Sequence, residues 1–101
     1  MADQIEVTNN REAGRLEVKL GDDVAFAEYR LSGDGIVFPH TVVPEAFEGR
    51  GVGGALVREG MKFAKEEGRL VTPTCSFFAG YLAKHPEYED QLDPSYRGKS
   101  A

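Results

Sequence analysis

Apolar and polar residues in the first half of the chain alternate with the period of β-strands. Between Arg15 and Leu20 every second residue is apolar, which predicts a half-buried strand over Arg15–Leu20. Turn signals then lead to two further apolar runs, Val24–Leu31 and Ile36–Val43, which we expect to continue an antiparallel meander. Residues 5–7 also alternate and predict a short first strand, after which "TNNREAG" is typical of a turn.

The second half of the chain has a helical period. Apolar residues recur at intervals of three and four through "GVGGALVREGMKFAKEEG", which predicts a helix that ends at Gly68. A strand over Leu70–Thr74 follows, and the helical connection makes it parallel to Ile36–Val43 through a right-handed crossover. A second, shorter helix is expected over Phe77–Lys84, and Pro86 ends it.

These elements predict an α/β (α+β) fold. The sheet is mixed and mostly antiparallel, with one helix opened by glycines and a second short helix. We expect a single domain over residues 1–92 and a flexible C-terminal tail over residues 93–101.

Composition narrows the function classes. The chain has 101 residues, 41% of them apolar, and a net charge of −5, which argues against a nucleic-acid binder because such proteins usually carry a basic excess. No apolar run approaches the roughly 20 residues that span a bilayer, and the N-terminus does not have the pattern of a signal peptide. The single cysteine, Cys75, cannot form an intramolecular disulfide. We therefore expect a cytoplasmic monomer that binds neither membranes nor nucleic acid.

Four glycines fall within six residues in "EGRGVGGALV", directly before the predicted long helix. The first N–H groups of a helix have no intrahelical partner, and glycines there let phosphate oxygens approach them. The segment lacks the Gly-Lys-Ser/Thr of a P-loop and the later acidic residue of the dinucleotide fingerprint. Two interpretations stay open: a phosphate-binding turn, or a turn that permits close packing of the helix on the sheet.

The same segment resembles motif A of the GNAT superfamily of N-acetyltransferases, Gln/Arg-x-x-Gly-x-Gly/Ala. Gly51 and Gly53 occupy the two signature glycines, whereas Glu48 departs from the usual Gln or Arg. With "FPHTVV" and "PTCSFFAGYLAKHPEY", the chain resembles a small GNAT-like family of about this length over residues 15–92. The resemblance implies a minimal acetyltransferase fold that binds acetyl-CoA or coenzyme A. It also implies that the elements with which larger members hold an acceptor amine are missing.

The resemblance further implies that coenzyme A lies between the Ile36–Val43 and Leu70–Thr74 strands, with its pyrophosphate on the glycine turn. The residues expected to bind it are Val42, Val43, Gly49, Arg50, Gly51, Val52, Gly53 and Gly54. Pro39 lies inside one of these strands and marks an edge or a bulge, because proline cannot donate to a strand ladder. Pro39 and Pro73 either keep the two strands apart or are simply prolines at strand ends.

Cys75 is a candidate nucleophile, since it follows a short strand and precedes a short helix. A thiol at a helix N-terminus has a lowered pKa and is more nucleophilic, although a lone cysteine is more often an inert buried residue. The resemblance implies that Cys75 lies near the sulfur of coenzyme A and that acetyl passes through an acetyl-Cys75 thioester. Alternatively, Cys75 only shapes the thiol pocket and acetyl passes directly to the acceptor.

His40 and Tyr81 complete the expected catalytic set. By strand alternation His40 shares a face with Phe38 and Val42, which is typical of a structural histidine, but the family carries a histidine here and its pKa suits a general base. Many superfamily members place a tyrosine near the position of Tyr81 to protonate the leaving thiolate; packing against Phe77 is the alternative. No cluster of Cys, His and Asp predicts a metal site.

The interpretation that accounts for most of these features is an acetyl-CoA-dependent N-acetyltransferase of the GNAT type that acts on an unidentified amine. A non-catalytic module that binds coenzyme A or acyl-CoA is the first alternative, favoured by the missing acceptor-binding elements. The paired His40 and Cys75 favour the enzyme. An interaction domain without a ligand is a further alternative, and the glycine turn argues against it.

Overall fold

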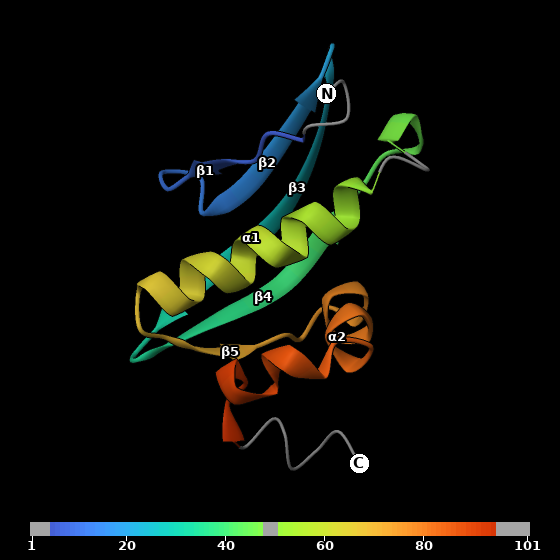
Figure 1. Ribbon diagram of the computed structural model, residues 1–101. Coiled ribbons are helices and arrows are strands. Elements are labelled where there is room, and N and C mark those ends of the chain that lie inside the picture. The colour runs from blue at the N-terminus through green and yellow to red at the C-terminus, as the bar shows by residue number, and fades with distance from the viewer. Residues whose placement is uncertain (1–4, 48–50, 95–101) are drawn as a thin grey trace.

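The computed structural model describes residues 5–47 and 51–94 and contains a five-stranded sheet crossed by one long helix (Figure 1). In chain order, the strands are β1 (Thr8–Asn10), β2 (Arg15–Leu20), β3 (Asp23–Ser32), β4 (Gly35–Val42) and β5 (Leu70–Thr72). The helices are α1 (Val52–Glu66) and α2 (Ser76–Ala83), with 3-10 turns η1 (Glu45–Phe47) and η2 (Pro86–Gln91).

The sheet has the predicted mixed topology. The strands lie side by side in chain order; β1 to β4 pair antiparallel, and β4 pairs with β5 in parallel across α1. The predicted α+β class is therefore confirmed. In the part of the chain that the structure describes, no helix is long and apolar enough to cross a membrane.

The core lies between α1 and the sheet face that α1 crosses. It is built from alternate residues of the strands and from the apolar stripe of α1, since strands alternate with period 2 and helices with period 3.6. Its largest fully buried side chains are Ile36, Phe38, Phe47, Leu56, Val57, Met61, Val71, Pro73 and Phe78. The stacked rings of Phe38 and Phe78, with centroids 4.2 Å apart, join α2 to this core.

The first strand differs from the prediction. The segment Thr8–Asn10, expected within a turn, pairs with Arg15–Glu17 as β1, and the turn is confined to residues 11–14. Two asparagine side chains explain the difference. That of Asn9 accepts a hydrogen bond from the hydroxyl of Tyr29 at 2.6 Å, and that of Asn10 accepts one from the N–H of Ala13 at 3.1 Å.

The last strand is shorter than expected, because β5 ends at Thr72, before Pro73. The chain then returns through α2 and η2 to the same strand, where Leu92 is buried and forms a parallel bridge with Val71. The N–H of Asp93, a residue assigned to the tail by the sequence, donates to the carbonyl of Val71 at 2.9 Å.

A bulge interrupts β4. Glu28 of β3 lies opposite His40 of β4. Two residues further along β3, Arg30 lies opposite Val37, which precedes His40 by three residues. One extra residue therefore sits in β4 at positions 38–39, and such a bulge reverses the alternation of side chains beyond it. The expectation that Pro39 marks an edge or a bulge is thus confirmed as a bulge.

The bulge corrects the predicted direction of His40. Phe38 faces α1, but beyond the bulge the residue on that face is Thr41, which lies opposite the buried Ala27. His40 lies on the other face of the sheet and is exposed. The prediction that His40 shares the face of Phe38 is therefore wrong, whereas its shared face with Val42 is confirmed.

Candidate active site

The parallel strands β4 and β5 are joined at one end and separate at the other. Their register runs only from Gly35–Leu70 to Val37–Thr72. One step further, the N–H of Cys75 donates to the carbonyl of Phe38 at 3.0 Å. Pairing thus stops beside Pro39 on β4 and Pro73 after β5, which fits both interpretations of these prolines.

The N-terminus of α1 begins at Gly51, whose φ of 71° lies in the left-handed region that favours glycine. The first backbone bond of the helix joins the N–H of Ala55 to the carbonyl of Gly51 at 3.1 Å. The N–H groups of Val52, Gly53 and Gly54 therefore precede the helical ladder. Among the residues that the structure describes, none comes within 4 Å of the place where a Cβ would lie at Gly51. Glu48 and the predicted ligands Gly49 and Arg50 lie outside the described residues.

Gly53 and Gly54 also allow α2 to pack closely on α1. A Cβ at Gly53 would lie only 2.4 Å from Cζ of Phe77, and one at Gly54 would lie 3.3 Å from Cε2 of Tyr81. The close-packing interpretation of the glycines thus applies, with α2 as the partner in place of the sheet. One consequence is that the first turns of the two helices lie against each other, as Figure 1 shows.

Cys75 is the N-cap residue of α2, with extended backbone angles of φ −75° and ψ 129°. Its half-buried thiol lies 3.5 Å from the hydroxyl of Thr41 on β4. Burial raises the pKa of the Cys75 thiol, but the Thr41 hydroxyl and the backbone N–H groups of Phe78 and Phe77 outweigh burial and hold the pKa below its ordinary value. The predicted placement of Cys75 at a helix N-terminus is confirmed, and the contact with Thr41 was not foreseen.

The rate at which iodoacetamide alkylates Cys75 is expected to rise at lower pH than for a free cysteine, whose pKa is about 8.5. The thiolate is the reacting form, so a depressed pKa moves the midpoint of the rate to lower pH. Thr41→Val should move the midpoint back up, because it removes the hydroxyl that stabilises the thiolate. Thr72→Val is the control on the neighbouring strand. A midpoint that Thr41→Val leaves unchanged would contradict this account of the thiol.

The structure does not bring His40 into contact with Cys75. The imidazole lies on the face opposite Thr41, with its ring centroid 6.3 Å from that of Phe26, and directly across from Glu28 on β3. No helix covers this face in the described residues, as Figure 1 shows. Any role for His40 as a base therefore concerns a group that approaches from the uncovered face.

Tyr81 lies on α2 at the surface between the two helices. Its hydroxyl accepts a hydrogen bond from Nη1 of Arg58 on α1 at 3.2 Å, and its ring stacks on His85 with centroids 4.1 Å apart. The role of Tyr81 as an acid stays a prediction. The contact with Arg58 gave no signal in the sequence, because the pairing of α1 with α2 decides it.

Val42 is the last residue of β4 and Val43 follows it; both are half-buried, and Val43 packs against the core. Their backbone contacts with coenzyme A stay a prediction. Phe77, expected only to pack against Tyr81, is 45% exposed and lies against Gly53 of α1.

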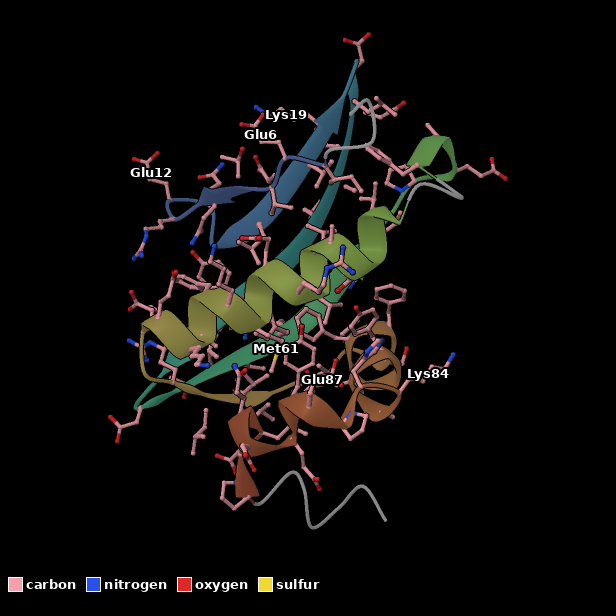
Figure 2. All side chains as sticks on the ribbon, in the orientation of Figure 1. Glu6, Glu12, Lys19, Met61, Lys84 and Glu87 are labelled. Carbon is pink, nitrogen blue, oxygen red and sulfur yellow. The ribbon has the colours of Figure 1, made fainter. Side chains whose placement is uncertain are left out.

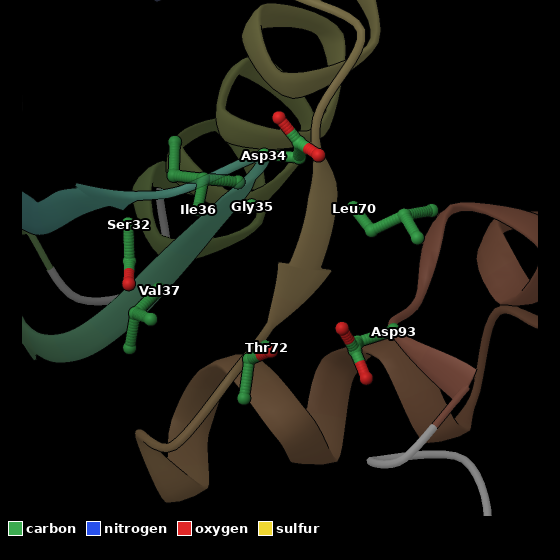
Figure 3. A pocket seen from close by; sticks show the side chains of 8 residues that line it. All are labelled: Ser32, Asp34, Gly35, Ile36, Val37, Leu70, Thr72 and Asp93. Atoms are coloured by element: carbon green, nitrogen blue, oxygen red, sulfur yellow. The ribbon is translucent and has the colours of Figure 1, made fainter.

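A groove of about 290 Å³ lies at the other end of the same strands, near Gly35 and Leu70 (Figure 3). Carboxylates of Asp34 and Asp93 line it, with the hydroxyl-bearing Ser32 and Thr72. Acidic side chains disfavour phosphate groups, and Cys75 follows the opposite end of β5. The groove is therefore separate from the candidate acetyl-transfer site.

The chain belongs to the GCN5-related N-acetyl-transferase family, whose model matches residues 15–91. It is 33% identical over 95 residues to protein NATD1 of Xenopus tropicalis, which covers 89% of this chain and 87% of the relative. Protein NATD1 of Mus musculus is 32% identical over 95 residues, with 89% and 86% covered.

A solved structure supports the same fold. The NMR solution structure of a GCN5-like protein from Staphylococcus aureus superimposes with a TM-score of 0.72 at 24% identity, covering 92% of this chain and 91% of that one. The small GNAT-like family inferred from the sequence is thus confirmed, and with it the assignment of the chain to the acetyltransferases.

Proposed function

We propose that this chain transfers an acetyl group from acetyl-CoA to an amine through an acetyl thioester on Cys75. The observation that carries the proposal is the meeting of two helix N-termini at the open end of the β4–β5 pair. One presents the N–H groups of residues 52–54, and the other holds a thiol of lowered pKa. Free N–H groups and the helix dipole suit a pyrophosphate, while the thiol suits an acyl group.

The residues present fit coenzyme A. Within residues 5–47 and 51–94, no side chain comes within 4 Å of a Cβ position at Gly51, which leaves room for a phosphate beside this residue. The strand gap begins beside Phe38, whose carbonyl binds the N–H of Cys75. A ligand extended from the helix turn along the end of β4, beside Val42 and Val43, would bring its thioester toward Cys75.

The chemistry on Cys75 proceeds in two balanced steps. The Cys75 thiolate attacks the acetyl carbonyl, a new S–C bond forms, and the thioester bond to coenzyme A breaks, so that coenzyme A leaves as a thiolate and takes up a proton. The acceptor amine then attacks acetyl-Cys75, loses a proton and restores the thiolate. The Cys75 thiol donates a hydrogen bond to the Thr41 hydroxyl, and after deprotonation this hydroxyl can donate to the thiolate, which favours the reactive form at the start and the end of the cycle.

A role for His40 as the base for the acceptor stays a prediction without support from the geometry, because the imidazole lies on the face of the sheet opposite Thr41 and Cys75. Tyr81 is proposed as the acid for the departing thiolate. Direct transfer without an acetyl-enzyme is the nearest alternative, and a module that binds coenzyme A without catalysis is the next. A location in the cytoplasm and a monomeric state complete the proposal.

The test is the intact mass of the protein after incubation with acetyl-CoA, with wild type beside Cys75→Ala. We expect one added acetyl group on wild type, released by hydroxylamine, and none on Cys75→Ala. An unmodified wild type that coenzyme A still stabilises in a thermal shift would overturn the covalent route and leave direct transfer or a binding module. An unmodified protein without any thermal shift would overturn acetyl-CoA as the ligand.

A further inference from the structure

We infer that the groove beside Gly35 and Leu70 is a docking site for a lysine side chain of a basic peptide. The groove lies on β4 and β5, whereas Cys75 follows the opposite end of β5, and the proposed acetyl transfer does not use the groove. The peptide is expected to bind without acetyl-CoA, so the inference does not depend on the proposed function.

The groove is formed on the face of the sheet that α1 does not cover. Ile36 and Val71 lie opposite each other in the parallel pair and point into the core, with 1% and 0% exposed. Side chains alternate along a strand, so the neighbours of these two residues face the other way. The groove is lined by those neighbours, Gly35, Val37, Leu70 and Thr72 (Figure 3). The helix α1 therefore does not block access to the groove.

The groove has an apolar wall. Leu70 is a large apolar side chain that is 41% exposed, and it lines the groove with Val37. Gly35 adds no side chain, and a Cβ there would lie 3.2 Å from the carbonyl oxygen of Leu70. The volume of about 290 Å³ is close to the lower limit of ligand pockets, roughly 300 Å³, and suits one extended side chain. The aliphatic stem of a lysine can pack on such a wall.

The rim of the groove is acidic. Asp34 comes from the β3–β4 turn and Asp93 from the segment after η2, and both line the groove with the hydroxyl-bearing Ser32 and Thr72. An ammonium group carries three donors and no acceptor, so it can bind carboxylate and hydroxyl oxygens together. The apolar wall and the acidic rim thus fit the two parts of a lysine side chain.

The turn that carries Asp34 is held in place by Arg69. Nη1 of Arg69 donates to the carbonyls of the two glycines that flank Asp34, at 2.9 and 3.1 Å, and its Nε lies 3.9 Å from Glu67. Arg30 is exposed on the same face but does not line the groove, and Lys84 extends from α2 away from β5 (Figure 2). No lysine or arginine of the described residues lines the groove, so the negative charge of its rim is complementary to a cation from a partner.

A basic peptide fits better than a single free amine because further acidic residues precede Asp93. Glu89 and Asp90 belong to η2 and are exposed. A segment with several cations can face these carboxylates while one lysine enters the groove. The net charge of −5 also favours association with a basic partner.

The experiment measures binding of a fluorescein-labelled peptide of alternating glycine and lysine to the full chain by fluorescence anisotropy, at low salt and without acetyl-CoA. Asp34→Asn is expected to weaken binding roughly threefold to fivefold, the effect of one partly exposed ion pair. Leu70→Ser should weaken it by a similar factor, because the apolar wall is lost. The same peptide with norleucine in place of lysine should not bind measurably.

Two variants of the β2–β3 hairpin are the matched controls. Asp22→Asn changes the net charge by the same amount as Asp34→Asn and is also made at an exposed site. Leu20→Ser is made at a leucine that is 37% exposed, close to the 41% of Leu70. Neither control should change the affinity by more than about twofold, since both sites lie two strands away from the groove. Thermal unfolding checks that all four variants stay folded.

Four results would overturn the inference. Equal weakening by Asp34→Asn and Asp22→Asn would show that the peptide responds only to the net charge. Spermidine that binds as tightly as the peptide would assign the groove to free amines. A roughly tenfold gain of affinity in the double variant Arg97→Gln with Lys99→Gln would show that the last residues of the chain compete as a tethered ligand. A wild type that does not bind the peptide would also overturn the inference, and the proposed function would stand, because acetylation of Cys75 tests it separately.

Discussion

Phe78→Ala is expected to lower the free energy of unfolding by about 3–5 kcal/mol, the usual cost of removing a fully buried aromatic ring. The Phe78 ring is 0% exposed and stacks on Phe38 at an interplanar angle of 11°. It also lies against the open side of Gly60, where a Cβ would be 3.0 Å from its Cζ. The substitution therefore leaves a cavity shared by β4, α1 and α2.

Phe77→Ala is the matched control for this prediction. Phe77 is the preceding residue of the same helix and has the same side chain, but it is 45% exposed. Its loss should cost about 1–2 kcal/mol, clearly less than the loss of Phe78, since about half of the ring is already in contact with water. Urea unfolding of the two variants followed by circular dichroism measures the difference. Equal destabilisation by the two substitutions would contradict the placement of α2 on the core.

Gly53→Val is expected to destabilise the fold by about 1–3 kcal/mol and to abolish measurable binding of coenzyme A. Valine is a better helix former than glycine, so propensity alone predicts a small gain. The overlap with Phe77 reverses the sign, because its Cζ would lie 2.4 Å from the new Cβ. The displaced ring and the added methyl groups would also crowd the N–H groups of the first turn.

Two further variants separate the effects of Gly53→Val. Gly80→Val places the same side chain on α2, where a Cβ meets nothing within 4 Å, and should change stability by less than about 0.5 kcal/mol. The double variant Gly53→Val with Phe77→Ala should recover most of the lost stability. Thermal unfolding and calorimetry with coenzyme A are the measurements. A Gly53→Val protein with wild-type stability and affinity would show that the contact between α1 and α2 is unimportant.

Most of the framework could be predicted because its signals are local. Alternation of apolar residues placed β2 at its observed bounds, and helical periodicity predicted α1, which begins at Val52 within the glycine-rich segment. Cys75 was expected before a short helix and is the N-cap of α2. The errors arose where distant segments decide the structure, as for β1, whose residue Asn9 binds Tyr29 twenty residues later.

The candidate site shows the same division. The single extra residue at the bulge of β4 turns His40 away from the thiol and brings Thr41 to it, and counting alternate positions cannot detect such an insertion. The glycine turn had two open interpretations, phosphate binding and close packing of the helix. Gly53 and Gly54 do allow close packing, but against α2 and not against the sheet. Arg58 had no signal in the sequence, because only the pairing of the two helices gives it a position.

The order of the strands has a consequence for how the chain folds. Strands β1 to β4 each lie beside their sequence neighbour, so they can form by successive short-range hairpins, while β5 must return across the whole of α1. Because long loops close more slowly, we expect residues 70–92 to join a preformed meander last and to open first in the native state. Hydrogen exchange should therefore be faster there than in β2 and β3. Cys75 lies in this segment, so its thiol would be exposed by partial opening long before the protein unfolds.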